Sequence, residues 1–302
     1  MSYGHINAEP KWILPPALRQ PRDSAWAEAN MRGHRLGCFL EGPSFDRSGN
    51  LFLVDVPFGR IFRVAPSGGW SLRCEYDGWP NGLKLHKDGR ILIADYRCGI
   101  LQLDVEQPAP TPLVTSFRSE GFLGCNDLFF AADESLWFTD QGQTGLHHPA
   151  GRIFRLEPDG HLACVLSNVP SPNGLVMNAS ENQLYVAVTR ANAVWRLPLM
   201  ADKSTSKVGL FIQLSGGLAG PDGLALDEEG GVIVAHPGIG VWRFDRVGRP
   251  THLIECPEGA MWTNIAFGGA ANDELHIVDS MAGAVYVARM PCPGKRMYSH
   301  CD

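Results

Sequence analysis

A motif repeats six times along the chain, and its spacing constrains the fold more than any other feature. In each copy one polar or charged residue precedes a strand-like segment, and a reference position follows 13 to 15 residues later. The first positions are Glu41, Asn81, Asn126, Asn173, Asp222 and Asn264, and the reference positions are Asp55, Asp95, Asp140, Ala187, Ala235 and Asp279. Successive copies begin 40 to 49 residues apart, which is typical of one four-stranded propeller blade per repeat. The sequence therefore predicts an all-β protein, a six-bladed β-propeller.

The two ends of the chain are expected to close the ring. After Asp279 only one further strand, GAVYVAR, precedes the proline-bearing C-terminal tail, so the last blade lacks a strand. Residues 34–40, HRLGCFL, precede Glu41 in the phase of an outer strand, and we expect them to fill that gap and remove an exposed sheet edge. Residues 1–33 are then predicted to form an N-terminal surface arm, and residues 34–302 a single propeller domain.

Composition and charge exclude several classes of function. The formal net charge is −6, and no run of Lys or Arg suits a nucleic-acid backbone. No apolar stretch reaches the about 18 residues of a membrane span, and no signal-peptide pattern opens the chain. Eight cysteines without a CxxC pair indicate reduced thiols. We therefore expect a cytoplasmic protein, a monomer or weak homo-oligomer, whose partner is a small molecule.

The six first positions are expected to converge at one mouth of the central channel, because innermost strands run along the propeller axis. Successive strands in a blade are antiparallel, so the end of the second strand lies at the same mouth as the start of the first. Further residues expected around this mouth are Phe58, Trp79, Tyr96, Arg97, Phe122, Gln141, Gln143, His147, His148, Thr189, Arg190, His236, Trp262 and Met281.

The converging side chains would offer only oxygen donors. Two are carboxylates, Glu41 and Asp222, and the others are carboxamides. Hard cations prefer such ligands, and two carboxylates neutralise a divalent ion. The pattern predicts one divalent cation, Ca²⁺ first, with Mg²⁺, Mn²⁺ or Zn²⁺ as alternatives. Each Asn-Gly or Asp-Gly pair taken alone is also typical of a tight turn, but a turn preference does not account for Glu41.

Four of these positions lie in motifs that resemble those of the SMP-30/gluconolactonase/luciferin-regenerating enzyme-like family, which are six-bladed propeller lactonases. The motifs are LEGPSF at Glu41, CNDLFF at Asn126 and Asp127, SPNGL at Asn173 and GPDGL at Asp222, and the resemblance covers about residues 36 to 290. It implies that Glu41, Asn173 and Asp222 bind the cation, with Asn126 as a fourth ligand or substrate contact. It further implies catalytic roles for Asp222, as base or nucleophile, and for Asn126.

One departure from the family pattern bears on the substrate. Sugar-lactone members often carry an arginine two places before the Asn-Asp pair, where this chain has Gly124. A polyhydroxylated substrate is therefore less favoured than a more apolar or aromatic lactone. The expected substrate contacts are Asn81, Asp127, Trp79, Phe122, Tyr96, His236, Trp262 and Asn264.

The predicted function is that of a divalent-metal-dependent hydrolase that opens a lactone. The cation would polarise the carbonyl group, and either Asp222 or a water molecule activated by the ion would carry the attack. Two alternatives stay open at this point: a hydrolase of organophosphates or of a diketone carbon–carbon bond at the same site, and a non-catalytic binding propeller with structural calcium. No GxSxG, P-loop, GxGxxG or HExxH motif occurs.

Overall fold

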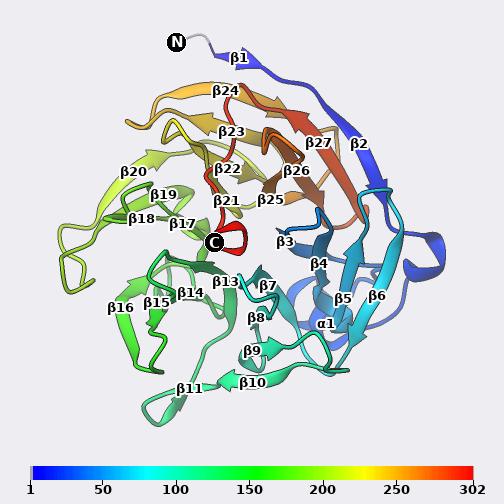
Figure 1. Ribbon diagram of the computed structural model, residues 1–302, viewed down its shortest axis with the longest axis horizontal. Coiled ribbons are helices and arrows are strands. Elements are labelled where there is room, and N and C mark those ends of the chain that lie inside the picture. Colours follow the sequence, from blue (N-terminus) through cyan, green and yellow to red (C-terminus); the bar gives the residue numbers. More distant parts are fainter. Residues whose placement is uncertain (1–2, 302) are drawn as a thin grey trace.

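The computed structural model describes residues 3–301, whose strands form six small sheets around a common axis (Figure 1). Each sheet contains four antiparallel strands that follow one another from the axis to the periphery, and one sheet carries in addition a short parallel strand at its outer edge. The predicted six-bladed β-propeller is therefore confirmed.

The first three blades are built from consecutive strands, each given from the axis outward. They are β3 (Leu40–Phe45), β4 (Leu51–Asp55), β5 (Arg60–Val64) and β6 (Trp70–Glu75); then β7 (Pro80–Leu85), β8 (Ile91–Asp95), β9 (Gly99–Leu103) and β10 (Thr111–Val114); then β13 (Cys125–Phe130), β14 (Leu136–Asp140), β15 (Gly151–Leu156) and β16 (Leu162–Val169). A small hairpin, β11 (Ser116–Phe117) and β12 (Glu120–Gly121), connects the second blade to the third.

The other three blades complete the ring, and the last two take strands from the N-terminus. They are β17 (Pro172–Met177), β18 (Gln183–Val188), β19 (Ala193–Pro198) and β20 (Gly209–Gln213); then β21 (Leu224–Leu226), β22 (Val232–His236), β23 (Gly240–Phe244), β24 (Pro250–Glu255) and the parallel edge strand β1 (Gly4–His5); then β25 (Trp262–Gly268), β26 (Glu274–Asp279), β27 (Ala284–Arg289) and β2 (Ala8–Ile13). The helical elements are α1 (Ala25–Asn30) and the short 3₁₀ turns η1 (Pro16–Leu18), η2 (Val56–Phe58), η3 (Thr189–Ala191) and η4 (Tyr298–His300).

An N-terminal strand completes the last blade, as predicted, but it is β2 and not residues 34–40. The segment predicted as a surface arm therefore supplies β2 to the last blade and β1 to the fifth. Strand β2 pairs antiparallel with β27 and buries Trp12 against the last and first blades. The error has a physical reason. At the other blade junctions at least two residues separate an outer strand from the next inner strand: β16 ends at Val169 and β17 begins at Pro172, and β6 ends at Glu75 and β7 begins at Pro80. Residues 34–40 run directly into β3 and leave no residues to cross a blade.

The two ends of the channel are chemically different. The start of each inner strand lies beside the end of the second strand, with Leu40 opposite Asp55 and Cys125 opposite Asp140, as the antiparallel order predicts. The C-terminal segment crosses the other end, near the centre of the ring in Figure 1. There Lys295 N–H donates to Leu226 O at the end of β21. The candidate residues therefore share the mouth that the C-terminal segment leaves free.

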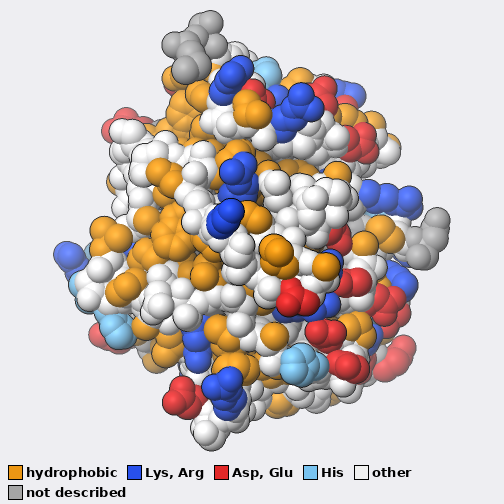
Figure 2. Space-filling view, turned by 90° about the vertical axis from the view of Figure 1, so that its left-hand side faces the viewer, with side chains coloured by type: hydrophobic (Ala, Val, Ile, Leu, Met, Phe, Trp, Pro, Cys, Tyr) orange, Lys and Arg blue, Asp and Glu red, His pale blue; other side chains and the backbone are white. Residues whose placement is uncertain are grey.

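The outer surface carries charges of both signs. On the side of the ring seen in Figure 2, Lys and Arg side chains are dispersed among acidic and apolar ones rather than gathered in a stripe. Within residues 3–301 no helix is long and apolar enough to cross a membrane.

Aspartates at the reference positions hold the chain where it enters an inner strand. Asp55 accepts a hydrogen bond from Phe39 N–H at 2.7 Å and a second from Arg60 Nε at 2.7 Å. In the third blade Asp140 accepts from Gly124 N–H at 2.8 Å and from Arg152 Nε at 2.8 Å. Each aspartate thereby fixes the backbone two residues before Glu41 or Asn126.

Replacing Asp55 by alanine should lower the free energy of unfolding by about 3–5 kcal/mol, because it leaves the buried Arg60 guanidinium without its partner. Chemical denaturation measures this loss. Asp77→Ala is the matched control, since Asp77 forms an exposed ion pair with Arg97 and should contribute far less. Equal losses in the two variants would contradict the structural role of Asp55.

Candidate metal and active site

The inner strands bring a set of oxygen-bearing side chains to one end of the channel. Glu41 stands on β3, Asn126 on β13, Asn173 on β17 and Asn264 on β25, and each retains 5% exposure or less. Asp222 precedes β21 and is half-buried. Its backbone N–H donates to Ala235 O at 2.9 Å, so the two motif positions of the fifth blade are in direct contact.

Carboxamides stand beside both carboxylates. Asn264 Nδ2 donates to Glu41 Oε2 at 2.9 Å across the junction of the last and first blades. Asn173, on β17, lies close enough to Asp222 to oppose the rise in the pKa of that carboxylate. Asn126 points its amide to Gln141 Oε1 at 2.9 Å. The side chains are thus oriented by their neighbours.

The acidic groups at the axis are crowded. Burial raises the pKa of Glu41 to about 7, although hydrogen bonds from Thr263, Asn264 and Gly42 oppose the shift. Removal from bulk water raises the pKa of Asp222 well above its usual range, and the charges of Glu41 and Asp127 raise it further. The hydrogen bonds around Glu41 and Asp222 therefore do not fully offset the cost of burying two carboxylates side by side.

This arrangement fits a divalent cation. Its donors are carboxylate and carboxamide oxygens, which are the ligands of hard ions, and a cation would offset the repulsion that raises both pKa values. Within residues 3–301 no group of three or more His, Cys, Asp and Glu side chains is arranged to hold a metal. An ion at this place would depend on the asparagines as much as on the acids.

The glycines that follow Asn81, Asn173 and Asp222 serve close packing and not turns. Gly82 lies in β7, and a Cβ there would approach Asn126 O of the neighbouring blade to 2.6 Å. Gly174 meets Asp222 O in the same way, and Gly223 meets Asn264. None of the three has the positive φ that a hairpin turn requires. The tight-turn interpretation of these pairs therefore does not hold.

Aromatic side chains line one side of the mouth. Tyr96 and Trp79 are half-buried, with ring centroids 6.2 Å apart. Gly124 lies against the Tyr96 ring, where a Cβ would come within 2.6 Å of Cζ. Tyr96 thus occupies the space that a side chain at position 124 would need. Helix α1 reaches the same rim, because Gln143 Nε2 donates to Asn30 Oδ1 at 2.9 Å and lies 3.2 Å from Tyr96 Oη.

The structure does not bring every expected substrate contact to this mouth. Phe122 is half-buried and packs edge-on against the stacked rings of Phe138 and Phe154 in the third blade, and Trp262 is buried against Tyr286. His236 is fully buried beneath the turn at Gly216, whose carbonyl lies 3.2 Å from its Nε2. The main contacts of these three side chains are with their own blades and not with the mouth of the channel.

Two other expected contacts differ in placement. Asn81 is half-buried at the start of β7. Asp127 points along the channel away from the mouth, where Lys84 Nζ lies 3.8 Å from its Oδ1 and Leu128 N–H donates to the same oxygen at 2.8 Å. Burial raises the pKa of Asp127, and Lys84 opposes that shift. Asp127 therefore acts on the candidate site through its charge.

Sequence reasoning missed Thr263, Lys84 and Asn30. Thr263 lowers the pKa of Glu41 and stands directly before Asn264, so its place in the repeat was a usable signal. Lys84 lies on an inner strand, three residues after a marked position. Asn30 belongs to α1, outside the repeats, and no periodic signal points to it.

The chain is similar in sequence to two lactonases of known name. The chain is 29% identical over 259 residues to a gluconolactonase of Zymomonas mobilis subsp. mobilis, covering 76% of this chain and 72% of that protein. It is 30% identical over 272 residues to lactonase drp35 of Staphylococcus aureus, covering 84% and 80%.

Solved structures share the fold. Regucalcin, a calcium-binding protein from Agrobacterium tumefaciens, superposes with a TM-score of 0.77 at 21% identity over 98% of both chains. A gluconolactonase from Xanthomonas campestris gives 0.74 at 23% identity, covering 94% of this chain and 99% of that one. The family model SMP-30/Gluconolactonase/LRE-like region matches residues 39–281, most of the propeller, and the chain therefore belongs to that family.

Proposed function

We propose that this protein is a divalent-cation-dependent hydrolase that opens lactones. The observation that carries the proposal is the meeting of Glu41 and Asp222 with asparagines from other blades at one mouth of the channel. Relatives named gluconolactonase and lactonase support the same reaction class.

Four side chains would hold the ion, namely Glu41, Asn126, Asn173 and Asp222. Ca²⁺ is the first choice, with Mg²⁺, Mn²⁺ or Zn²⁺ as alternatives, because the donors are all oxygens. A bound cation would supply electrophilic polarisation of the lactone carbonyl.

The protein's own groups would do the remaining work. Asp222 is the one of the two carboxylates that retains partial exposure, so a water molecule can reach it and give up a proton to it. Asn126, oriented by Gln141, would donate a hydrogen bond to the substrate. Asn264 fixes Glu41 by its hydrogen bond, and this keeps the charged side chain in position for binding.

The rim favours a substrate less polar than a sugar lactone. Tyr96 and Trp79 present aromatic surface, and Tyr96 fills the space beside Gly124. An arginine at position 124, which could fork onto hydroxyl groups, would clash with that ring. We therefore propose an aliphatic or aromatic lactone, whose ring can pack on Tyr96 and Trp79.

A cytoplasmic setting completes the proposal. Over residues 3–301 all eight cysteines are free thiols, and four of them are buried. Free thiols persist in reducing compartments, whereas oxidising ones favour disulfides.

The test is turnover of aliphatic, aromatic and sugar lactones, followed by a pH indicator with and without a chelator. We expect chelator-sensitive hydrolysis, fastest on the aliphatic or aromatic lactones. If the protein hydrolyses organophosphates or diketones but none of the lactones, the site serves that reaction and the lactonase proposal is wrong. A protein that binds Ca²⁺ and turns over none of these compounds would be a binding propeller, and the proposal would be wrong.

Glu41→Gln should weaken cation binding roughly a hundredfold, because it removes one of two charged ligands. Isothermal titration of the metal-free protein with Ca²⁺ measures the change. Glu106→Gln is the control, since Glu106 is exposed on the β9–β10 connection and should leave the affinity unaltered. Wild-type affinity in Glu41→Gln would remove Glu41 from the ligand set.

A further inference from the structure

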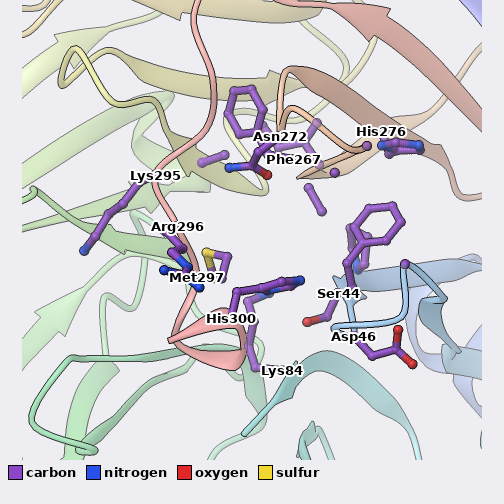
Figure 3. A pocket seen from close by; sticks show the side chains of 18 of the residues that line it. Ser44, Asp46, Lys84, Phe267, Asn272, His276, Lys295, Arg296, Met297 and His300 are labelled. Atoms are coloured by element: carbon purple, nitrogen blue, oxygen red, sulfur yellow. The ribbon is translucent and has the colours of Figure 1, made fainter. Parts of the chain in front are cut away.

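A cavity lies inside the ring, where the C-terminal segment crosses the channel (Figure 3). Its volume is about 860 Å³, within the range of pockets that bind small molecules. The later residues of the inner strands form its walls, including Phe45, Phe129 and Phe267. Neither Glu41 nor Asp222 lines it, so it is separate from the candidate active site.

Apolar side chains make up the body of this cavity. Leu175, Leu224 and Ile265 line it from three different inner strands, together with the three phenylalanines. Such walls offer water few hydrogen-bonding partners and suit a hydrocarbon group. The cavity therefore favours a ligand with an apolar body.

The charges around the cavity are mainly positive. Five lysines and arginines line it against three acidic residues; the cations are Lys11, Arg47, Lys84, Lys295 and Arg296, and the acids are Asp46, Asp127 and Glu228. Three of the cations are engaged elsewhere: Lys11 with Glu274, Lys295 with Glu181, and Arg47 with Ser299 O and Cys301 O. Lys84 is paired only with Asp127, at 3.8 Å, and Arg296 has no such partner among residues 3–301.

These two side chains keep unused donors. Lys84 Nζ lies 3.8 Å from Asp127 Oδ1, beyond hydrogen-bonding distance, and it makes no hydrogen bond among residues 3–301. Arg296 is exposed and forms neither an ion pair nor a side-chain hydrogen bond within the same residues. By contrast, the acidic Asp46 is occupied by the Ser48 and Asn50 N–H groups at 2.9 and 2.8 Å.

The C-terminal segment covers one side of the cavity. Figure 3 shows Lys295, Arg296, Met297 and His300 along it, with Phe267 and His276 on a different side. The segment is tied down by Lys295 N–H to Leu226 O at 2.7 Å and by the Ser299 hydroxyl to Phe45 O at 3.4 Å. Arg296 is thereby held over an apolar chamber.

We propose that this cavity is a binding site for a small amphiphilic carboxylate. The hydrocarbon part would lie among the inner-strand side chains, and the carboxylate would take hydrogen bonds from Lys84 and Arg296, which are charge-assisted and hence strong. The site is independent of the lactonase proposal, because it uses none of the residues assigned to hydrolysis.

Isothermal titration of the full chain with decanoate tests the proposal, with decanol as the uncharged comparison. We expect decanoate to bind and decanol to bind more weakly. Arg296→Gln should weaken decanoate binding roughly tenfold, the value of one charge-assisted hydrogen bond. Ala225→Phe, at a position that lines the cavity, should prevent binding by filling the chamber.

Two further variants identify the occupied site. Arg246→Gln removes an exposed arginine from the β23–β24 turn and should leave binding unchanged. Asp222→Asn should also bind decanoate normally. Loss of binding in Asp222→Asn would place decanoate in the active site and overturn the proposal. Absence of decanoate binding to the wild type, or full affinity in Arg296→Gln, would overturn it too. Arg296 is exposed, so this variant stays informative even if Ala225→Phe fails to fold.

Discussion

Replacing Asp222 by asparagine should abolish lactone hydrolysis while the propeller stays folded. The amide keeps the shape of the side chain but cannot accept a proton from water, and general-base catalysis contributes roughly 10²- to 10⁴-fold in rate. Loss of a charged ion ligand adds to this deficit. Steady-state kinetics on the best lactone of the panel, at saturating Ca²⁺, measures the effect on kcat.

The thermal stability of the metal-free protein should not fall in Asp222→Asn, although its activity does. The pKa of Asp222 is raised by burial and by the charges of Glu41 and Asp127, so its ionised form opposes folding at neutral pH when no cation is bound. The neutral asparagine relieves this cost, and the metal-free variant should melt at the same temperature as the wild type or higher.

Asp202→Asn is the matched control, because Asp202 caps an exposed turn through Ser204. It should retain full activity. Wild-type kcat in Asp222→Asn would show that this carboxylate takes no part in the reaction, whereas an unfolded variant would assign it a structural role in place of a chemical one.

Removing residues 1–13 should destabilise the whole ring. The truncation strips β2 from β27 and takes away Trp12, which is 8% exposed in the core between the last and first blades. Loss of a buried tryptophan alone costs about 3–5 kcal/mol. The bared edge of β27 would also be free to pair with other chains. Thermal melting and light scattering should show a lower Tm and aggregation.

A shorter truncation tests whether the loss of stability comes from losing β2 or simply from shortening the N-terminus. Removing residues 1–5 takes away β1, which pairs only at its two residues with the outer strand β24, and should change Tm little. If both truncations melt alike, the ring does not depend on β2. If the longer one is as stable as the wild type, β27 needs no partner.

The sequence by itself determined the number of blades and the mouth at which the marked residues gather. Glu41, Asn126 and Asn173 recur at one phase of a repeat whose four strands pair with their immediate neighbours along the chain. Because each blade is built from strands that are neighbours along the chain, a residue's position in the repeat determines its blade and the end of the channel at which it lies. The repeat spacing also predicts which residues face each other in antiparallel strands, such as Leu40 and Asp55.

Only the tertiary structure decided which strand closes the ring and what surrounds the site. The pairing of β2 with β27 joins residues more than 270 positions apart, and no repeat phase encodes it. Phe122 and Trp262 share the mouth-side phase, yet Phe122 packs against two phenylalanines of its own blade and Trp262 is buried against Tyr286. Gly124 and Tyr96 lie in different blades, so their contact depends on how blades pack. Long-range contacts of this kind follow from the shapes of the packed surfaces, which periodicity along the chain does not specify.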